Sequence, residues 1–182
     1  MAEKLNDTQK KYISEIDEII DLVGLDYNKI LNYDKEARTE SLLNIKDQII
    51  RSSVLMEYLR IDWYLTQIII RYYFGEDKSM IDLWKNKKFE LFNYHILEKL
   101  YLINKLELAK KIIQIPESIN NKISKINDLR NSLAHSLFPE NRRVKVLYNN
   151  KSIQDMQGFK EYQDDINKVT EFFIDNVLKA TN

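Results

Sequence analysis

Residues 116–139, PESINNKISKINDLRNSLAHSLFP, predict a helix that begins near Pro116 and ends before Pro139. Proline is favoured in the first turn of a helix and does not continue a helix past its last residue. Four apolar residues recur at helical spacing and should face the protein core: Ile119, Ile123, Ile126 and Leu133. Because these residues take up one side of the helix, the other side is available to polar residues.

Polar side chains gather near the C-terminal end of this predicted helix. Asn131 and His135 are four residues apart and therefore share a face, with Asn127 and Ser124 behind them. Arg130 lies roughly 140° around the helix axis from His135, but a long arginine side chain can turn toward a group at the helix end. We expect this polar face to look into a cleft or onto a partner.

These three residue types suit phosphodiester chemistry. A histidine titrates near neutral pH and can give or take a proton. An arginine stays charged and binds phosphate oxygens with a planar fork. An asparagine offers an uncharged donor to a developing oxyanion. In such chemistry His135 would give or take a proton, Arg130 would stabilise charge on the phosphorane, and Asn131 would orient the phosphate or His135.

The segment Arg130-Asn131-Ser132-Leu133-Ala134-His135 resembles the R-x4–6-H motif of HEPN-domain proteins, including the polar residue that often follows the arginine. The resemblance implies an all-α, HEPN-like helical bundle in which the motif closes a helix. It also implies a homodimer whose two motifs face each other and divide the acid and base roles. Many members of that family are metal-independent endoribonucleases, and several are toxins or antiviral-defence effectors.

The resemblance therefore predicts an endoribonuclease with RNA as its substrate, no metal and no cofactor, and an antitoxin or another regulatory protein as a further partner. The catalytic residues would be Arg130, His135 and Asn131. In the HEPN toxins that an antitoxin silences by adenylylation, a tyrosine lies two residues after the histidine. This chain has Leu137 there, so we do not extend that form of control to it.

Two other interpretations remain open. In the first, His135 and Asn131 cap or satisfy backbone groups at the helix C-terminus, and Arg130 pairs with Asp128 or another surface acid. In the second, the chain is a non-catalytic HEPN-like module that binds RNA, a nucleotide or a partner protein. The second histidine, His95, sits within another apolar pattern, and we expect it to be a packing or surface residue.

Charge is distributed unevenly around the motif, although the formal net charge of the whole chain is zero. Between residues 122 and 145 the basic residues outnumber the two acidic ones. Four of the basic residues are candidates for binding RNA phosphates: Lys125, Arg142, Arg143 and Lys145. From residue 154 onward acidic residues predominate. An ordinarily charged helical surface would explain the same pattern.

Composition favours long helices, because the 182 residues contain only 3 glycines and 2 prolines. The absence of cysteine excludes disulfides, zinc–thiolate sites and thiol nucleophiles. No apolar run is long enough to span a membrane, and the first residues contain no apolar signal core. We expect a cytoplasmic protein without membrane association.

Apolar periodicity predicts further helices on both sides of the motif. We expect residues 1–182 to form a single HEPN-like helical domain, with residues 1–34 as a possible N-terminal extension. A two-asparagine turn at Asn149 predicts a small β-hairpin just after the motif helix. The other expected helices span residues 7–23, 35–74, 89–102, 105–114 and 159–178, with a short helix within 76–88 and a possible break in the longest at Ser52.

Overall fold

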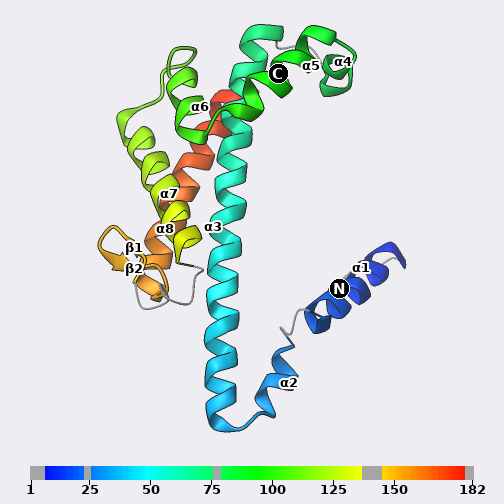
Figure 1. Cartoon of the computed structure of the whole chain (residues 1–182), viewed down its shortest axis with the longest axis vertical. Helices are drawn as coiled ribbons and strands as arrows, with labels where there is room; N and C mark the ends of the chain where they lie inside the picture. The colour runs from blue at the N-terminus through cyan, green and yellow to red at the C-terminus, as the bar shows by residue number, and fades with distance from the viewer. Residues whose placement is uncertain (1–6, 23–25, 76–78, 137–144, 179–182) are drawn as a thin grey trace, which may run out of the picture. The chain divides into compact units, whose positions relative to one another are not determined.

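The computed structural model describes residues 7–22, 26–75, 79–136 and 145–178. Within these ranges the regular structure is helical except for one two-stranded antiparallel hairpin (Figure 1). The predicted all-α class with a small β-hairpin is therefore confirmed. No helix in the described ranges combines the length and the apolar character needed to cross a membrane.

The chain divides after Ile49 into two compact units. The first unit contains α1 (Asp7–Leu22), α2 (Tyr27–Leu31) and the beginning of α3 (Lys35–Phe74). Ile30 of α2 is buried, whereas Tyr12, Ile16 and Ile19 of α1 are exposed. The helical spacing of these α1 residues is thus seen in the structure, but it does not correspond to a buried face.

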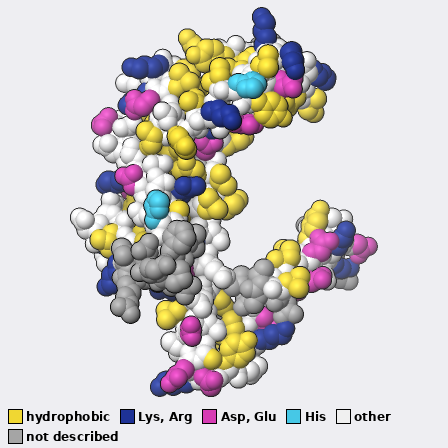
Figure 2. Space-filling view, in the orientation of Figure 1, with side chains coloured by type: hydrophobic (Ala, Val, Ile, Leu, Met, Phe, Trp, Pro, Cys, Tyr) yellow, Lys and Arg dark blue, Asp and Glu magenta, His cyan; other side chains and the backbone are white. Residues whose placement is uncertain are grey.

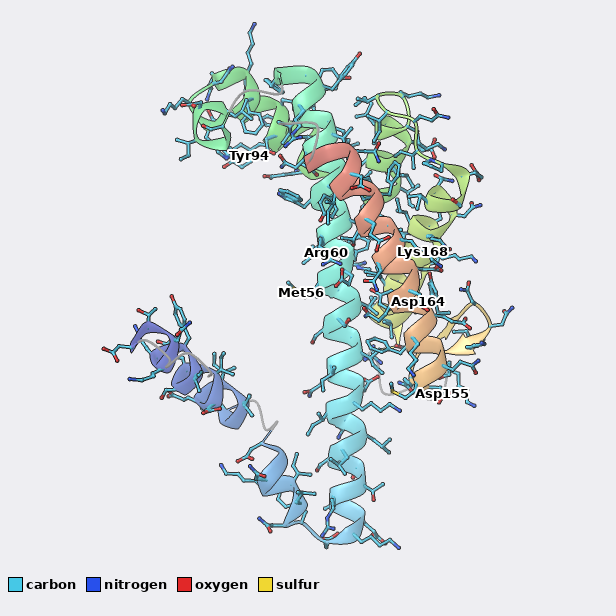
Figure 3. The ribbon with its side chains drawn as sticks, turned by 180° about the vertical axis from the view of Figure 1, so that it is seen from behind. Met56, Arg60, Tyr94, Asp155, Asp164 and Lys168 are labelled. Carbon is cyan, nitrogen blue, oxygen red and sulfur yellow. The ribbon has the colours of Figure 1, made fainter. Side chains whose placement is uncertain are left out.

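The long helix α3 has the predicted bounds and runs without a break through Ser52 and Ser53. The Ser53 hydroxyl accepts a hydrogen bond of 3.1 Å from Nε2 of Gln163 in the last long helix, α8 (Met156–Phe173). Farther along, Nη2 of Arg60 donates to the Thr170 hydroxyl at 3.0 Å. Figure 3 shows Arg60 on α3 beside the α8 helix. Ser53 therefore joins two helices instead of interrupting one.

The second unit contains the other elements. They are α4 (Met80–Trp84), α5 (Lys87–His95), the 3₁₀ turn η1 (Leu97–Lys99), α6 (Leu102–Ala109), α7 (Glu117–His135), β1 (Leu147–Tyr148), β2 (Lys151–Ser152), α8 and the π-helical turn η3 (Ile174–Leu178). Three predicted helices have wrong bounds. The one expected over 89–102 ends at His95 and is followed by η1, and the one expected over 105–114 is α6, which ends at Ala109. The one expected over 159–178 is α8, which begins at Met156 and ends at Phe173, where η3 follows.

Two apolar clusters explain this arrangement. The larger one is built from α3, α6, α7, α8 and the hairpin, and it buries the four apolar residues predicted for the motif helix. Burying each such side chain contributes about 1.5–3 kcal/mol. The smaller cluster buries Phe89 and Leu97 together, which brings η1 back against α5. Around it large apolar side chains stay exposed, such as Ile81 and Tyr94. Figure 2 shows several hydrophobic side chains on the surface of the upper part of the chain.

The hairpin turns at the predicted asparagines. Leu147 pairs with Ser152 and Tyr148 pairs with Lys151. Asn149 has φ 48° and Asn150 has φ 65°, in the left-handed region that asparagine tolerates better than most residues. The turn leaves the Tyr148 side chain buried against α8.

A polar network fastens this hairpin to α7 and α8. The Asp165 carboxylate accepts a hydrogen bond from Lys122 Nζ at 2.5 Å and another from the Tyr148 hydroxyl at 3.0 Å. Burial acts to raise the pKa of Asp165, but these hydrogen bonds and the charges of Lys122 and Lys168 outweigh it and hold the pKa below its usual value. Burial and the neighbouring Asp165 raise the pKa of Tyr148, so the phenol stays a donor.

The lowered pKa makes part of the stability dependent on pH. Asp165 binds fewer protons when folded than when unfolded, so its contribution is full above the unfolded pKa of about 3.9 and disappears as pH falls through the lower folded pKa. We expect wild type to be more stable than Asp165→Asn at pH 7, and the difference to shrink below about pH 4. Urea unfolding of both proteins at several pH values measures it. A difference that stays constant with pH would contradict this assignment.

Gly158 permits a close approach between α8 and the hairpin. A Cβ atom at this position would lie 2.1 Å from the carbonyl oxygen of Ser152. Alanine ordinarily stabilises a helix relative to glycine by about 1 kcal/mol, but here we expect Gly158→Ala to lower the free energy of unfolding by about 1–3 kcal/mol through overpacking. Urea unfolding checks this, with the neighbouring exposed Gln157→Ala as the control. Stabilisation by Gly158→Ala would disprove the clash.

Candidate functional site

The C-terminal end of α7 is tied to α3. The backbone N–H of Ser136 donates to the Ser132 carbonyl at 3.1 Å, and the Ser136 hydroxyl donates to the Leu133 carbonyl at 2.9 Å. Nη1 of Arg51 donates to the same Leu133 carbonyl at 2.6 Å and to the Ser136 hydroxyl at 3.1 Å. Two carbonyls of the last turn thus have partners, and α3 holds the helix end that carries His135.

Arg130 is held in place from two sides. Its Nη1 donates to Oδ1 of Asn131 at 3.1 Å, and its guanidinium carbon lies 5.1 Å from the centre of the Tyr58 ring, within cation–π range. Burial raises the pKa of Tyr58, Arg130 lowers it, and Asp62 raises it further, so the ring stays a neutral phenol. The neutral Tyr58 ring therefore holds the guanidinium through a cation–π contact and does not neutralise its positive charge.

The motif residues differ in exposure. His135 is the last residue of α7 and is exposed, whereas Arg130 and Asn131 are half-buried. The alternative in which Arg130 pairs with Asp128 does not match these contacts, because Arg130 engages Asn131 and Tyr58. The structure thus presents an imidazole to solvent on a helix whose preceding turn carries a restrained arginine and an asparagine.

A pocket of about 220 Å³ lies beside these residues, and we call it the two-arginine pocket. Its walls come from one face of α3 and one face of α7, each with helical spacing. They are Arg51, Val54 and Leu55, and Arg130, Leu133 and Ala134. Within the described residues, the lining thus combines two cations with four apolar side chains and contains no carboxylate.

The predicted phosphate-binding residues are placed less uniformly. Lys125 donates to Oδ1 of Asn149 at 2.8 Å and lines a second pocket with Asp128, away from the lining of the two-arginine pocket. Lys145 is exposed just before β1. Arg142 and Arg143 lie outside the described residues. A role for these four residues in RNA binding stays a prediction.

Arg51 and Tyr58 were not among the residues predicted from the sequence. Both come from α3, far from the motif in the chain, and nothing in the motif itself refers to them. One signal was available, because Arg51, Val54, Leu55 and Tyr58 have the spacing of a single helix face. In the structure, Arg51 on this face donates to the end of α7.

Comparison with protein-family models finds no match for the chain, and comparisons with curated proteins and with solved structures find none either. The class that the fold and the site define is therefore a structural one. It is an all-α protein with a small β-hairpin, whose motif helix ends in an exposed histidine beside a pocket with two arginines. In the described residues, no group of three or more His, Asp or Glu side chains is placed to hold a metal ion.

Proposed function

We propose that this protein is a metal-independent endoribonuclease of the HEPN type. The observation that carries the proposal is the end of α7, where an exposed His135 follows a restrained Arg130 and Asn131 on the same helix. These are the proton-transfer, charge-stabilising and orienting groups that cleavage through a 2′-hydroxyl needs.

The chemistry of this proposal is an internal transesterification. The RNA 2′-oxygen gives up its proton, attacks the adjacent phosphorus and forms a P–O bond, while the bond from phosphorus to the 5′-oxygen breaks and that oxygen receives a proton. The products are a 2′,3′-cyclic phosphate and a free 5′-hydroxyl. His135 moves one of these protons, and Arg130 faces the charge that grows on the phosphate oxygens.

A homodimer fits the proposal, because one motif supplies only one histidine and the reaction moves two protons. In two facing motifs, one His135 would act as the base and its counterpart as the acid. A toxin or antiviral-defence role, with an antitoxin or another protein in control, follows from the same resemblance. We propose that this activity acts on RNA within the cytoplasm.

The test is cleavage of a mixed RNA pool by the purified full chain in EDTA, with analysis of the product ends. We expect cutting that leaves 2′,3′-cyclic phosphate ends. A His135→Ala preparation, purified in the same way, controls for contaminating nucleases. A folded, dimeric wild type that binds RNA but never cuts it would refute the nuclease and favour the binding module.

A further inference from the structure

We propose that the two-arginine pocket binds one nucleotide of a single-stranded RNA, with the base against its apolar walls and the adjoining phosphates on Arg51 and Arg130. This inference rests on the proposed function for its choice of RNA, but its binding chemistry stands on the pocket alone. The proposal thus adds a substrate subsite, formed by α3 as well as by the motif helix.

The position of the two arginines supports this assignment. Arg51 contacts Leu133 and Ser136 at the end of α7, whereas Arg130 packs on Tyr58, seven residues further along α3. The helices therefore run antiparallel here, and the cations mark two ends of the same pocket. Two positive charges flanking a pocket without a carboxylate in its described lining favour a ligand with anionic groups on both sides.

The apolar residues of the pocket would contact the base. Val54 and Leu133 are buried, and Leu55 and Ala134 are exposed, so the apolar wall continues from the core to the surface. The faces of nucleobases are largely apolar, so a base can be buried against this aliphatic wall with little dependence on sequence. At about 220 Å³, the pocket is smaller than the roughly 300–1,000 Å³ typical of whole drug-sized ligands, which suits one base of a longer strand.

The pocket also adjoins the catalytic face. Ala134 lines it, and His135 follows about 100° further around α7. In the same way, Arg130 lines the pocket, and Asn131 follows it about 100° further around the helix. A strand with one base in the pocket would therefore continue across Asn131 and His135, and the pocket would select which phosphate meets the histidine.

The experiment measures binding of a fluorescent single-stranded RNA hexamer by anisotropy, in a His135→Ala background so that the RNA stays intact. Ala134→Leu fills the pocket without removing a hydrogen bond, and we expect it to weaken binding about tenfold, the effect of losing roughly 55 Å² of buried apolar area. Leu55→Ala removes part of the wall and tests the same contact in a second way. Asn121→Leu, which places a leucine at another exposed position of α7, is the matched control and should bind like its parent.

The salt dependence separates the base from the phosphates. Each phosphate contact on a single strand contributes about 0.7 to the slope of log affinity against log salt concentration. We expect Arg51→Gln to reduce the slope by about 0.7 and weaken binding about tenfold at low salt. Arg51→Lys should keep the slope because it keeps the charge. Ala134→Leu should keep the slope while losing affinity, because it affects the base alone.

The outcomes are distinct. If Ala134→Leu and Leu55→Ala bind the hexamer as tightly as Asn121→Leu, the pocket is not a base site and the inference is wrong, even if wild type cleaves RNA. If these variants weaken binding and wild type never cleaves, the pocket stands and the proposed ribonuclease fails. Competition by 5′-AMP as strong as that by the hexamer would identify a free nucleotide as the ligand and overturn the RNA assignment.

Discussion

Replacement of His135 by alanine is expected to lower the rate of RNA cleavage in EDTA by about 100- to 10,000-fold, the range that a positioned acid or base contributes. The structure indicates that this variant should change the chemistry and not the fold. The side chain is exposed, and the carbonyls of Ser132 and Leu133 are bonded by Ser136 and Arg51. We therefore expect the variant to keep its fold, so that rate constants from initial product formation compare the chemistry of two folded proteins.

The matched control is His95→Ala, because His95 is the other histidine of the chain, is exposed and lies at the end of α5. We expect the His95 variant to cleave RNA at the wild-type rate and both variants to unfold at the wild-type urea concentration. Equal cleavage by wild type and the His135 variant would rule out the imidazole as the acid or base.

The second large effect is expected in stability. Asp165→Ala removes the acceptor of Lys122 and of the buried Tyr148 hydroxyl. Breaking a buried ion pair costs about 3–5 kcal/mol because the remaining charge stays uncompensated. The Lys122 side chain keeps 23% of its exposure, so water compensates part of the loss. We therefore expect the free energy of unfolding to fall by about 3 kcal/mol, the lower end of that range.

Urea unfolding at pH 7 measures this loss, and Asp164→Ala provides the control because its carboxylate is adjacent but exposed (Figure 3). The control should change stability by less than about 0.5 kcal/mol. A double variant, Lys122→Met with Asp165→Leu, should recover the part of the stability that the unpaired Lys122 charge costs, while the buried Tyr148 hydroxyl still lacks its acceptor. A single variant as stable as the control would mean that the network does not fasten the hairpin.

The elements with strong periodicity could be predicted from the sequence. Helix α3 has the expected bounds, α7 begins after Pro116 as expected, and Asn149 and Asn150 form the turn of the predicted hairpin. Their signals are local: apolar spacing, a proline at the start of a helix, and residues that tolerate positive φ. The break at Ile96 has no local signal. It follows from the joint burial of Phe89 and Leu97, which is a tertiary effect.

The candidate site shows the same contrast between local signals and tertiary packing. Arg130, Asn131 and His135 could be proposed from the sequence because they lie within one helical segment, where Asn131 and His135 share a face. The supporting residues were not found, because Tyr58 and Arg51 meet the motif only after α3 packs against α7. A sequence motif specifies the groups that would react. Packing specifies what holds them and what shape lies next to them.

The bond from Arg51 to Leu133 joins residues 82 positions apart in the chain. It follows that the six-residue motif is not a transferable module. A graft of residues 130–135 into another helix would lack the guanidinium that holds its last turn, and substitutions at Arg51 and within the motif should show epistasis instead of adding. A transplanted motif would therefore need an arginine placed as Arg51 is, on a second helix packed against it.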